Sequence, residues 1–367
     1  MKGGTPRYYP EVNAICLCVV IDILSMFPRL RAFEIRAINL NFNACCSTPP
    51  AQPFSPIDIK YLNLADLTSC NASLQPVIKL LGLFNRIHSL QIVEVWVHGD
   101  AREGADELAK STINKDLAEL PSSWSPSLAL LTIAGTPEGM FAPYTHILTT
   151  RNMLGDLEEL NIQCCNWEDL PCAAAIISSN KGLSELTIDV STLIMQEVEV
   201  DNEEDLLSMT IQPDRWKDFK LSSLHSLRYF ETSVKLFIPE SKEDFPTVQP
   251  SVRGFQYMLD FLSHAPRSIE DLTIVLKFEW SDQYRQSLSQ DYDWGRLATI
   301  IYSFPAIKTA NIIVADRSPA FLAVSAQCGR IVMNGFTRSS KIRENNRVIR
   351  ILCQHADYDN FLLDTDV

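Results

Sequence analysis

A short pattern of apolar positions, apolar-x-x-apolar-x-apolar, recurs along the whole chain. The clear copies are Leu30-x-x-Phe33-x-Ile35, Ile59-x-x-Leu62-x-Leu64, Ile87-x-x-Leu90-x-Ile92, Leu128-x-x-Leu131-x-Ile133, Leu157-x-x-Leu160-x-Ile162 and Leu183-x-x-Leu186-x-Ile188. Weaker copies are Leu227-x-x-Phe230-x-Thr232, Ile269-x-x-Leu272-x-Ile274 and Ile307-x-x-Ala310-x-Ile312. Alternation over the last four positions is typical of a short β-strand that buries one face. The nine copies therefore predict nine strands.

Apolar residues at i, i+3, i+4 and i+7 precede four of these copies. The sets are Val20, Ile23, Leu24, Phe27; Leu74, Val77, Ile78, Leu81; Phe255, Met258, Leu259, Leu262; and Leu297, Ile300, Ile301, Phe304. Each set places an apolar stripe on one helix face, so it predicts an amphipathic helix. Three of these helices are expected to be followed directly by a strand. The connecting segments are similar: Phe27-Pro28-Arg29-Leu30, Phe84-Asn85-Arg86-Ile87 and Phe304-Pro305-Ala306-Ile307. Pro or Asn is expected to end the helix there.

The copies begin 26 to 44 residues apart, and the shorter intervals match one strand, one helix and tight turns. The pattern resembles leucine-rich repeats, of the irregular kind found in fungal F-box/leucine-rich-repeat-like proteins. The resemblance covers roughly residues 19–315, and its most specific pieces are Phe27-Pro-Arg-Leu30, Leu157-Glu-Glu-Leu-Asn-Ile162 and Leu183-Ser-Glu-Leu-Thr-Ile188. The chain departs from the consensus at the ninth position, where only Cys165 supplies the usual Asn or Cys. An F-box is not visible, because the N-terminus lacks its Leu-Pro-x-Glu opening.

The resemblance implies an α/β fold, a leucine-rich-repeat-like solenoid or horseshoe. Parallel strands are expected on its concave face and helices on its convex face. Residues 1–330 would form about nine irregular repeats, with an acidic insertion near 190–223, and residues 331–367 a C-terminal cap or tail. In that insertion, six acidic residues crowd into 197–205. They indicate either an acidic docking loop or a solvated insertion.

The net charge of −13 argues against a general role in binding nucleic acid, because an acidic chain is repelled by phosphate backbones. The apolar run Ala14–Ile21 is ended by Asp22 and is too short to span a membrane. The ten cysteines contain no C-x-x-C pair, which favours buried reduced thiols over a metal or redox site. Reduced thiols predict a cytoplasmic or nuclear protein.

Motifs of catalysis are not found in the sequence. It contains no G-x-S-x-G, G-x-G-x-x-G or H-E-x-x-H, and no two of its six histidines are four residues apart. We therefore expect no enzyme activity, no catalytic residue, no metal site and no cofactor. The alternative is an enzyme on another α/β fold, such as a (β/α) barrel, whose strand–helix alternation would look alike. A solenoid predicts an elongated particle, so small-angle scattering separates the two.

The residues between the apolar positions are expected to form the exposed polar face of the strands. From the fifth copy to the eighth, this face is predicted to carry acidic side chains with no Lys or Arg among them. The candidate partner-binding residues are Glu159, Asn161, Glu185, Asp189, Glu231 and Asp271. They indicate either an acidic cradle for a basic segment of a partner protein or a generic polar face. Replacing Glu185 and Asp189 with Lys is expected to weaken partner capture and to leave the fold intact.

The favoured hypothesis is a non-catalytic protein–protein interaction scaffold. It is similar to the substrate-recognition region of an F-box-type ubiquitin-ligase subunit, and the resemblance alone implies an adaptor of such a ligase as a second partner. Nucleic acid and membrane are not expected partners.

Overall fold

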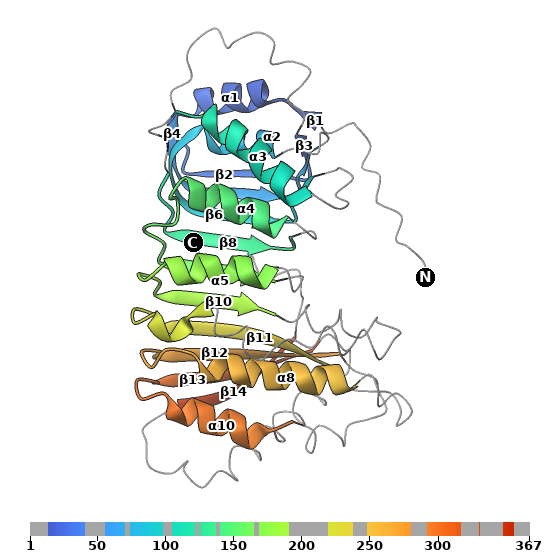
Figure 1. Ribbon diagram of the computed structural model, residues 1–367, viewed down its shortest axis with the longest axis vertical. Helices are drawn as coiled ribbons and strands as arrows, with labels where there is room; N and C mark the ends of the chain where they lie inside the picture. The colour runs from blue at the N-terminus through green and yellow to red at the C-terminus, as the bar shows by residue number, and fades with distance from the viewer. Residues whose placement is uncertain are drawn as a thin grey trace. The chain divides into compact units, whose positions relative to one another are not determined.

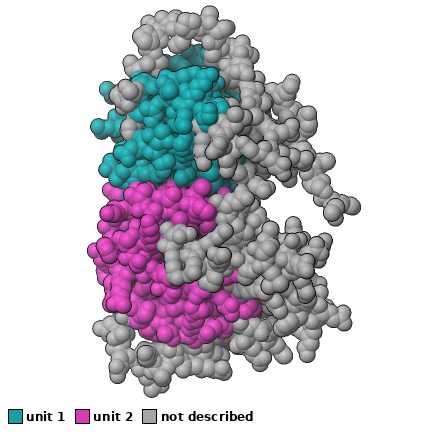
Figure 2. Space-filling view, in the orientation of Figure 1, with its two compact units in different colours: residues 1–157 teal, residues 158–367 magenta. Residues whose placement is uncertain are grey.

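The structure is a computed structural model (Figure 1). It describes residues 14–40, 56–69, 74–97, 105–121, 124, 126–136, 140–164, 169–190, 219–237, 248–279, 292–316, 330 and 348–355. The acidic run at 197–205 and most of the tail beyond 330 lie outside these residues. The described chain forms two compact units, residues 1–157 and 158–367 (Figure 2).

Unit 1 contains four parallel main strands in chain order, and its described helices lie before the first strand, between the later strands and after the last. The strands are β2 (Ala32–Arg36), β4 (Ile57–Ala65), β6 (Phe84–Val93) and β8 (Leu130–Ala134). The helices are α1 (Leu17–Met26), α2 (Gln75–Leu81), α3 (Ala105–Ala118) and α4 (Phe141–Thr150). A second sheet of two-residue parallel strands contains β1 (Ala14–Ile15), β3 (Asn39–Leu40), β5 (Thr68–Ser69) and β7 (Trp96–Val97).

Unit 2 repeats this architecture with six parallel strands in chain order. They are β9 (Glu159–Gln163), β10 (Glu185–Asp189), β11 (Tyr229–Phe237), β12 (Asp271–Glu279), β13 (Thr309–Asp316) and β14 (Val348–His355). Between them lie α5 (Asp169–Ser179), the short 3₁₀ helix η4 (Leu221–Ser223), α8 (Val248–Ser263) and α10 (Trp294–Ser303). The helices α5, α8 and α10 cover one face of these strands (Figure 1). The predicted α/β class with parallel strands is confirmed.

All nine predicted strands form, and most begin at the third position of their copy. The reason is a backbone feature that several copies share. In the sixth copy, the amides of Ser184 and Glu185 both donate to the carbonyl of Glu158, at 2.8 and 3.1 Å. The same two-to-one contact recurs at Arg31, Ser184, Arg228 and Glu270. It inserts one extra residue, as a β-bulge does. The apolar residues at the first and fourth positions of a copy therefore both face the core, although they are three positions apart.

Each main strand of unit 1 ends in a sharp bend at the eighth position of the copy. There the backbone is left-handed, at Ala37, Asp66, Glu94 and Gly135, with φ between 50° and 59°. The amides of Ala37, Asp66 and Glu94 donate to carbonyls of the next strand, at 3.0–3.1 Å. The ninth position then turns inward, and Leu67 and Val95 are buried there. The carbonyl of Val95 accepts a hydrogen bond from the Tyr144 hydroxyl of α4, at 2.9 Å.

The four predicted helices form as α1, α2, α8 and α10, and two details differ. Phe27 is 55% exposed: α1 ends at Met26, so Phe27 is the C-cap residue and does not continue the buried stripe of Val20 and Leu24. Asn85 does not end a helix, because α2 ends at Leu81 and Phe84 already pairs with Ile57 of β4. The helices α3, α4 and α5, the short strands of unit 1 and strand β14 were not predicted.

The predicted reduction of every cysteine is wrong at one position. Cys16, which caps the N-terminus of α1, is disulfide-bonded, whereas Cys18, Cys164 and Cys172 are reduced. A cytoplasmic or nuclear location stays a prediction.

Candidate functional site

The polar face of unit 2, which we call the acidic face, consists of the third, fifth and seventh positions of copies five to eight. Its register places the predicted residues in three rows across the strands. The first row is Glu159, Glu185, Tyr229 and Asp271; the second is Asn161, Thr187, Glu231 and Thr273; the third is Gln163, Asp189, Ser233 and Val275. All six predicted residues therefore lie on one face. The alternation of apolar and polar positions accounts for this arrangement in rows.

Glu159 and Glu185 are direct neighbours in the first row. Glu185 is exposed and Glu159 is half-buried. Burial, and then the negative charge of Glu185, raise the pKa of Glu159. Neither carboxylate forms an ion pair with a described residue. Two like charges side by side without a counter-ion are unfavourable, and a cation between them would relieve the repulsion.

Glu231 lies in the second row and accepts a hydrogen bond from the hydroxyl of Tyr229. Burial is the main cause that raises the pKa of Glu231, while the Tyr229 hydrogen bond and the positive charge of Lys277 act in the opposite direction. Burial, followed by the charge of Glu231, raises the pKa of Tyr229, so Tyr229 stays a neutral donor. The Glu231 carboxylate is thus held in a fixed orientation beside the row of Glu159 and Glu185.

Asp189 does not belong to the accessible part of the acidic face, which corrects the prediction. Its side chain is 9% exposed, and one carboxylate oxygen lies 2.6 Å from the ammonium of Lys277, whose side chain is 6% exposed. The Ser233 hydroxyl donates to the other oxygen. Asp189 is therefore a structural residue whose charge is neutralised inside unit 2. Replacing it with Lys would place two ammonium groups in one buried site and would not leave the fold intact.

The expectation that the acidic face carries no Lys or Arg is also wrong, because Lys277 lies on this face next to Asp189. Strand β12 continues for nine residues, so Lys277, at the ninth position of the eighth copy, points to the same side as Asp271 and Thr273. The sequence contained a signal for this, because Lys also occupies the ninth position of the preceding copy, as Lys235. The prediction had assumed that each strand stops at the seventh position.

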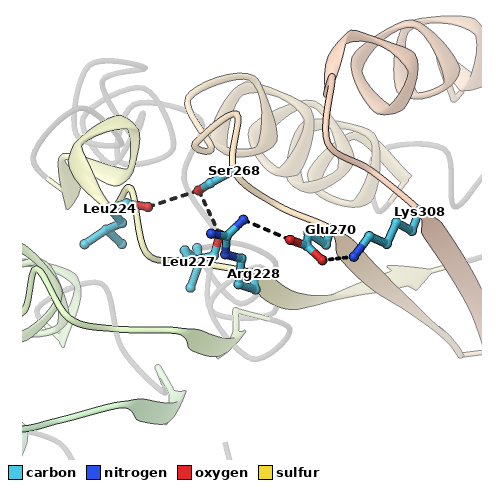
Figure 3. Close-up of polar contacts among 6 residues, drawn as sticks. All are labelled: Leu224, Leu227, Arg228, Ser268, Glu270 and Lys308. Carbon is cyan, nitrogen blue, oxygen red and sulfur yellow. Dashed lines mark hydrogen bonds and ion pairs between the residues drawn. The ribbon is translucent and has the colours of Figure 1, made fainter.

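A ladder of ion pairs lies where the strands of unit 2 begin (Figure 3). The carboxylate of Glu270 binds Arg228 at 2.9 Å through one oxygen and Lys308 through the other. Hydrogen bonds from these two cations and their charges lower the pKa of Glu270. These residues occupy the second position of copies seven, eight and nine, so the charges of neighbouring copies compensate one another.

The corresponding edge of unit 1 carries an open pocket of about 680 Å³, which was not predicted. The lining residues are Arg29, Leu30, Arg31, Asp58, Ile59, Lys60, Arg86, His88, Ser127, Ala129 and Asp156. Five of them are basic side chains. Arg31, Lys60 and His88 stand at the second position of copies one, two and three, the position that forms the ion-pair ladder in unit 2.

Other kinds of site are not evident in the described chain. Within it, no three His, Cys, Asp or Glu side chains gather closely enough to hold a metal ion. None of its helices combines the length and the apolar character needed to cross a membrane. No protein-family model matches the chain, and a search of curated proteins finds no significant match.

Proposed function

We propose that this protein is a non-catalytic protein–protein interaction scaffold whose acidic face in unit 2 binds a basic segment of a partner. The observation that carries the proposal is the adjacent pair Glu159 and Glu185, two carboxylates that face outward without a described counter-ion. Asn161, Glu231 and Asp271 lie on the same face: Asn161 on the strand of Glu159, and Glu231 and Asp271 one and two strands beyond Glu185. A Lys or Arg side chain of a partner would neutralise the pair and use the neighbouring oxygens as further acceptors.

For both units we propose the fold of a leucine-rich-repeat-like solenoid. Each unit has strands in chain order, helices between them and a hydrogen-bond pattern that repeats from copy to copy. Among the described strands, β2 and β14 each pair with a single neighbour. A (β/α) barrel leaves no strand with one neighbour, so this order favours a solenoid over the enzyme alternative.

The binding proposal is tested with a short Lys-rich peptide and the full chain, by fluorescence anisotropy at 50 and 200 mM salt. The double variant Glu159→Gln/Glu185→Gln is expected to bind the peptide about 5- to 30-fold more weakly, since charge contacts to one exposed and one half-buried carboxylate contribute roughly 1–2 kcal/mol together. Glu158→Gln is the matched control, because Glu158 is the same residue type next to the site but at the edge where the strand begins. Equal binding by the double variant and the control would contradict the acidic-face proposal.

The ubiquitin-ligase part of the proposal rests on the family resemblance and has its own test. Affinity capture of the full chain from fungal cells, followed by mass spectrometry, is expected to recover a ubiquitin-ligase adaptor. Recovery of basic partners without any adaptor would remove the ubiquitin link and leave the scaffold proposal in place.

A further inference from the structure

The pocket of unit 1 concentrates positive charge in a protein whose net charge is −13. We call it the basic pocket. Its cationic side chains are Arg29, Arg31, Lys60 and Arg86, with the imidazole of His88 beside them. All five side chains are exposed, so they reach solvent rather than the core.

Strand pairing makes several of these residues neighbours. The carbonyl of Arg31 accepts hydrogen bonds from the amides of Lys60 and Tyr61, at 2.9 Å each. The carbonyl of His88 accepts one from Ala129, at 3.0 Å, and Arg86 is the register partner of Asp58. Adjacent strands lie about 4.8 Å apart, so the backbones that carry these side chains are held at that spacing by the sheet. The charges are gathered by the fold and do not depend on a mobile loop.

The cations of the basic pocket are not neutralised by the described chain. None of Arg29, Arg31, Lys60 and Arg86 forms an ion pair with a carboxylate of the described residues, although Asp58 and Asp156 line the same pocket. Asp156 instead accepts a hydrogen bond from the Ser127 hydroxyl, at 2.6 Å. The ladder of unit 2 provides an internal comparison, because there the same repeat positions alternate in sign and Arg228 and Lys308 are paired through Glu270.

Charge and size together define the class of ligand. The four cations and two carboxylates give the pocket a net charge of +2, which matches a phosphomonoester dianion. Guanidinium groups hold phosphate oxygens through paired N–H donors, and three of the four cations are Arg. A volume of about 680 Å³ is typical of pockets that hold a small organic molecule, so there is room for the group that carries the phosphate.

We infer that the basic pocket is a binding site for a phosphomonoester. Arg31 and Arg86 hold the phosphate oxygens, and Lys60 adds a third positive charge. The phosphate could be carried by a free sugar phosphate or by a phosphorylated side chain of a peptide, because both present the same dianion. The inference concerns unit 1 and does not depend on the acidic face of unit 2.

The test is isothermal titration calorimetry of the full chain in 0.1 M NaCl at pH 7.5 with three probes. They are glucose 6-phosphate, a phosphoserine pentapeptide and the same pentapeptide without phosphate. The wild type is expected to bind at least one of the two phosphorylated probes. It should bind that probe at least tenfold more tightly than it binds the unphosphorylated peptide. Preference for glucose 6-phosphate assigns the site to small molecules, preference for the phosphopeptide assigns it to modified proteins, and equal binding shows that the phosphate alone is recognised.

Matched variants connect binding to the pocket. Arg31→Gln and Arg86→Gln are each expected to weaken binding of the phosphorylated probe at least tenfold. Arg228→Gln, an exposed Arg at the second position of another copy, is expected to change it less than twofold. No binding of either phosphorylated probe by the wild type, or equal losses in Arg86→Gln and Arg228→Gln, would overturn the inference. Peptide binding at the acidic face is measured on the same variants, so failure of one proposal is distinguished from failure of the other.

Discussion

The buried ion pair between Asp189 and Lys277 is expected to be essential for the stability of unit 2. The ammonium and carboxylate lie 2.6 Å apart, and their side chains are 6% and 9% exposed. At an effective dielectric constant near 20, this distance corresponds to an attraction of about 6 kcal/mol, which mostly offsets the cost of removing both charges from water. Asp189→Ala removes the attraction and leaves the buried Lys277 ammonium without its ion-pair partner at 2.6 Å. The free energy of unfolding should therefore fall by about 3–5 kcal/mol.

Urea titration followed by circular dichroism measures this loss. With a denaturant slope of about 2 kcal/mol/M, the unfolding midpoint of unit 2 should fall by roughly 1.5–2.5 M. Hydrogen exchange of peptides that cover residues 271–279 shows whether the loss is local to unit 2. The double variant Asp189→Ala/Lys277→Met should recover most of the stability, because both charges of the buried pair are removed together. Asp271→Ala, on the same face and half-exposed, is the control. Equal midpoints for Asp189→Ala and Asp271→Ala would refute the reasoning.

Two further predictions concern single side chains. Tyr144→Phe removes the buried hydroxyl that donates to the carbonyl of Val95, so unit 1 should lose about 1–2 kcal/mol of unfolding free energy in urea titration, whereas a loss below 0.3 kcal/mol would contradict that role. Glu159→Gln should raise the unfolding free energy at pH 7 by about 0.5 kcal/mol, because burial and Glu185 disfavour the ionised form of Glu159 in the folded state. Because the pKa of Glu159 is raised, this gain is present at neutral pH, where the wild-type carboxyl is ionised. The gain disappears as the pH falls through the raised pKa towards the ordinary value of 4.5, because the wild-type carboxyl then becomes protonated. Thermal unfolding of both proteins from pH 4 to 8 measures the difference, and a gain that grew towards pH 4 would reverse the assigned sign.

Much of the fold was predictable because burial leaves a periodic trace in the sequence. Leu183, Leu186 and Ile188 are all fully buried, as the repeated pattern requires. The weak seventh copy also forms a strand, although its sixth position is Thr232, which is completely buried between Ile188 and Ile274. Tertiary pairing overrides the polar side chain there, since the neighbours on both sides fix the register.

Elements without this trace were missed for physical reasons. Helix α3 is polar along much of its length, so periodicity alone did not reveal it. Strand β14 contains Arg350 and lacks the repeat pattern, and it exists because β13 offers it a partner in register. Local propensity carries no information about such a partner.

In the candidate sites, too, features within one strand could be predicted from the sequence, whereas contacts between strands could not. The rows of the acidic face followed from alternation, which acts within a strand. The pairing of Asp189 with Lys277 joins residues that are 88 positions apart, and the basic pocket joins residues from Arg29 to Asp156. Such contacts depend on which strands are neighbours and on how far each strand extends. Both properties are settled by the assembled sheet.

At the start of several strands, two successive amides donate to one carbonyl of the preceding strand, and this contact fixes the register whatever the length of the connection between the strands. Only 26 residues separate the starts of the fifth and sixth copies, whereas 44 separate those of the sixth and seventh. Glu185 nevertheless pairs with Glu159 on one side and with Tyr229 on the other in the same register. Insertions and deletions in the connections therefore leave the neighbours on the polar face unchanged. Natural variation can lengthen one part of this protein while preserving the arrangement of side chains in another, so the connections and the binding surfaces are able to evolve separately.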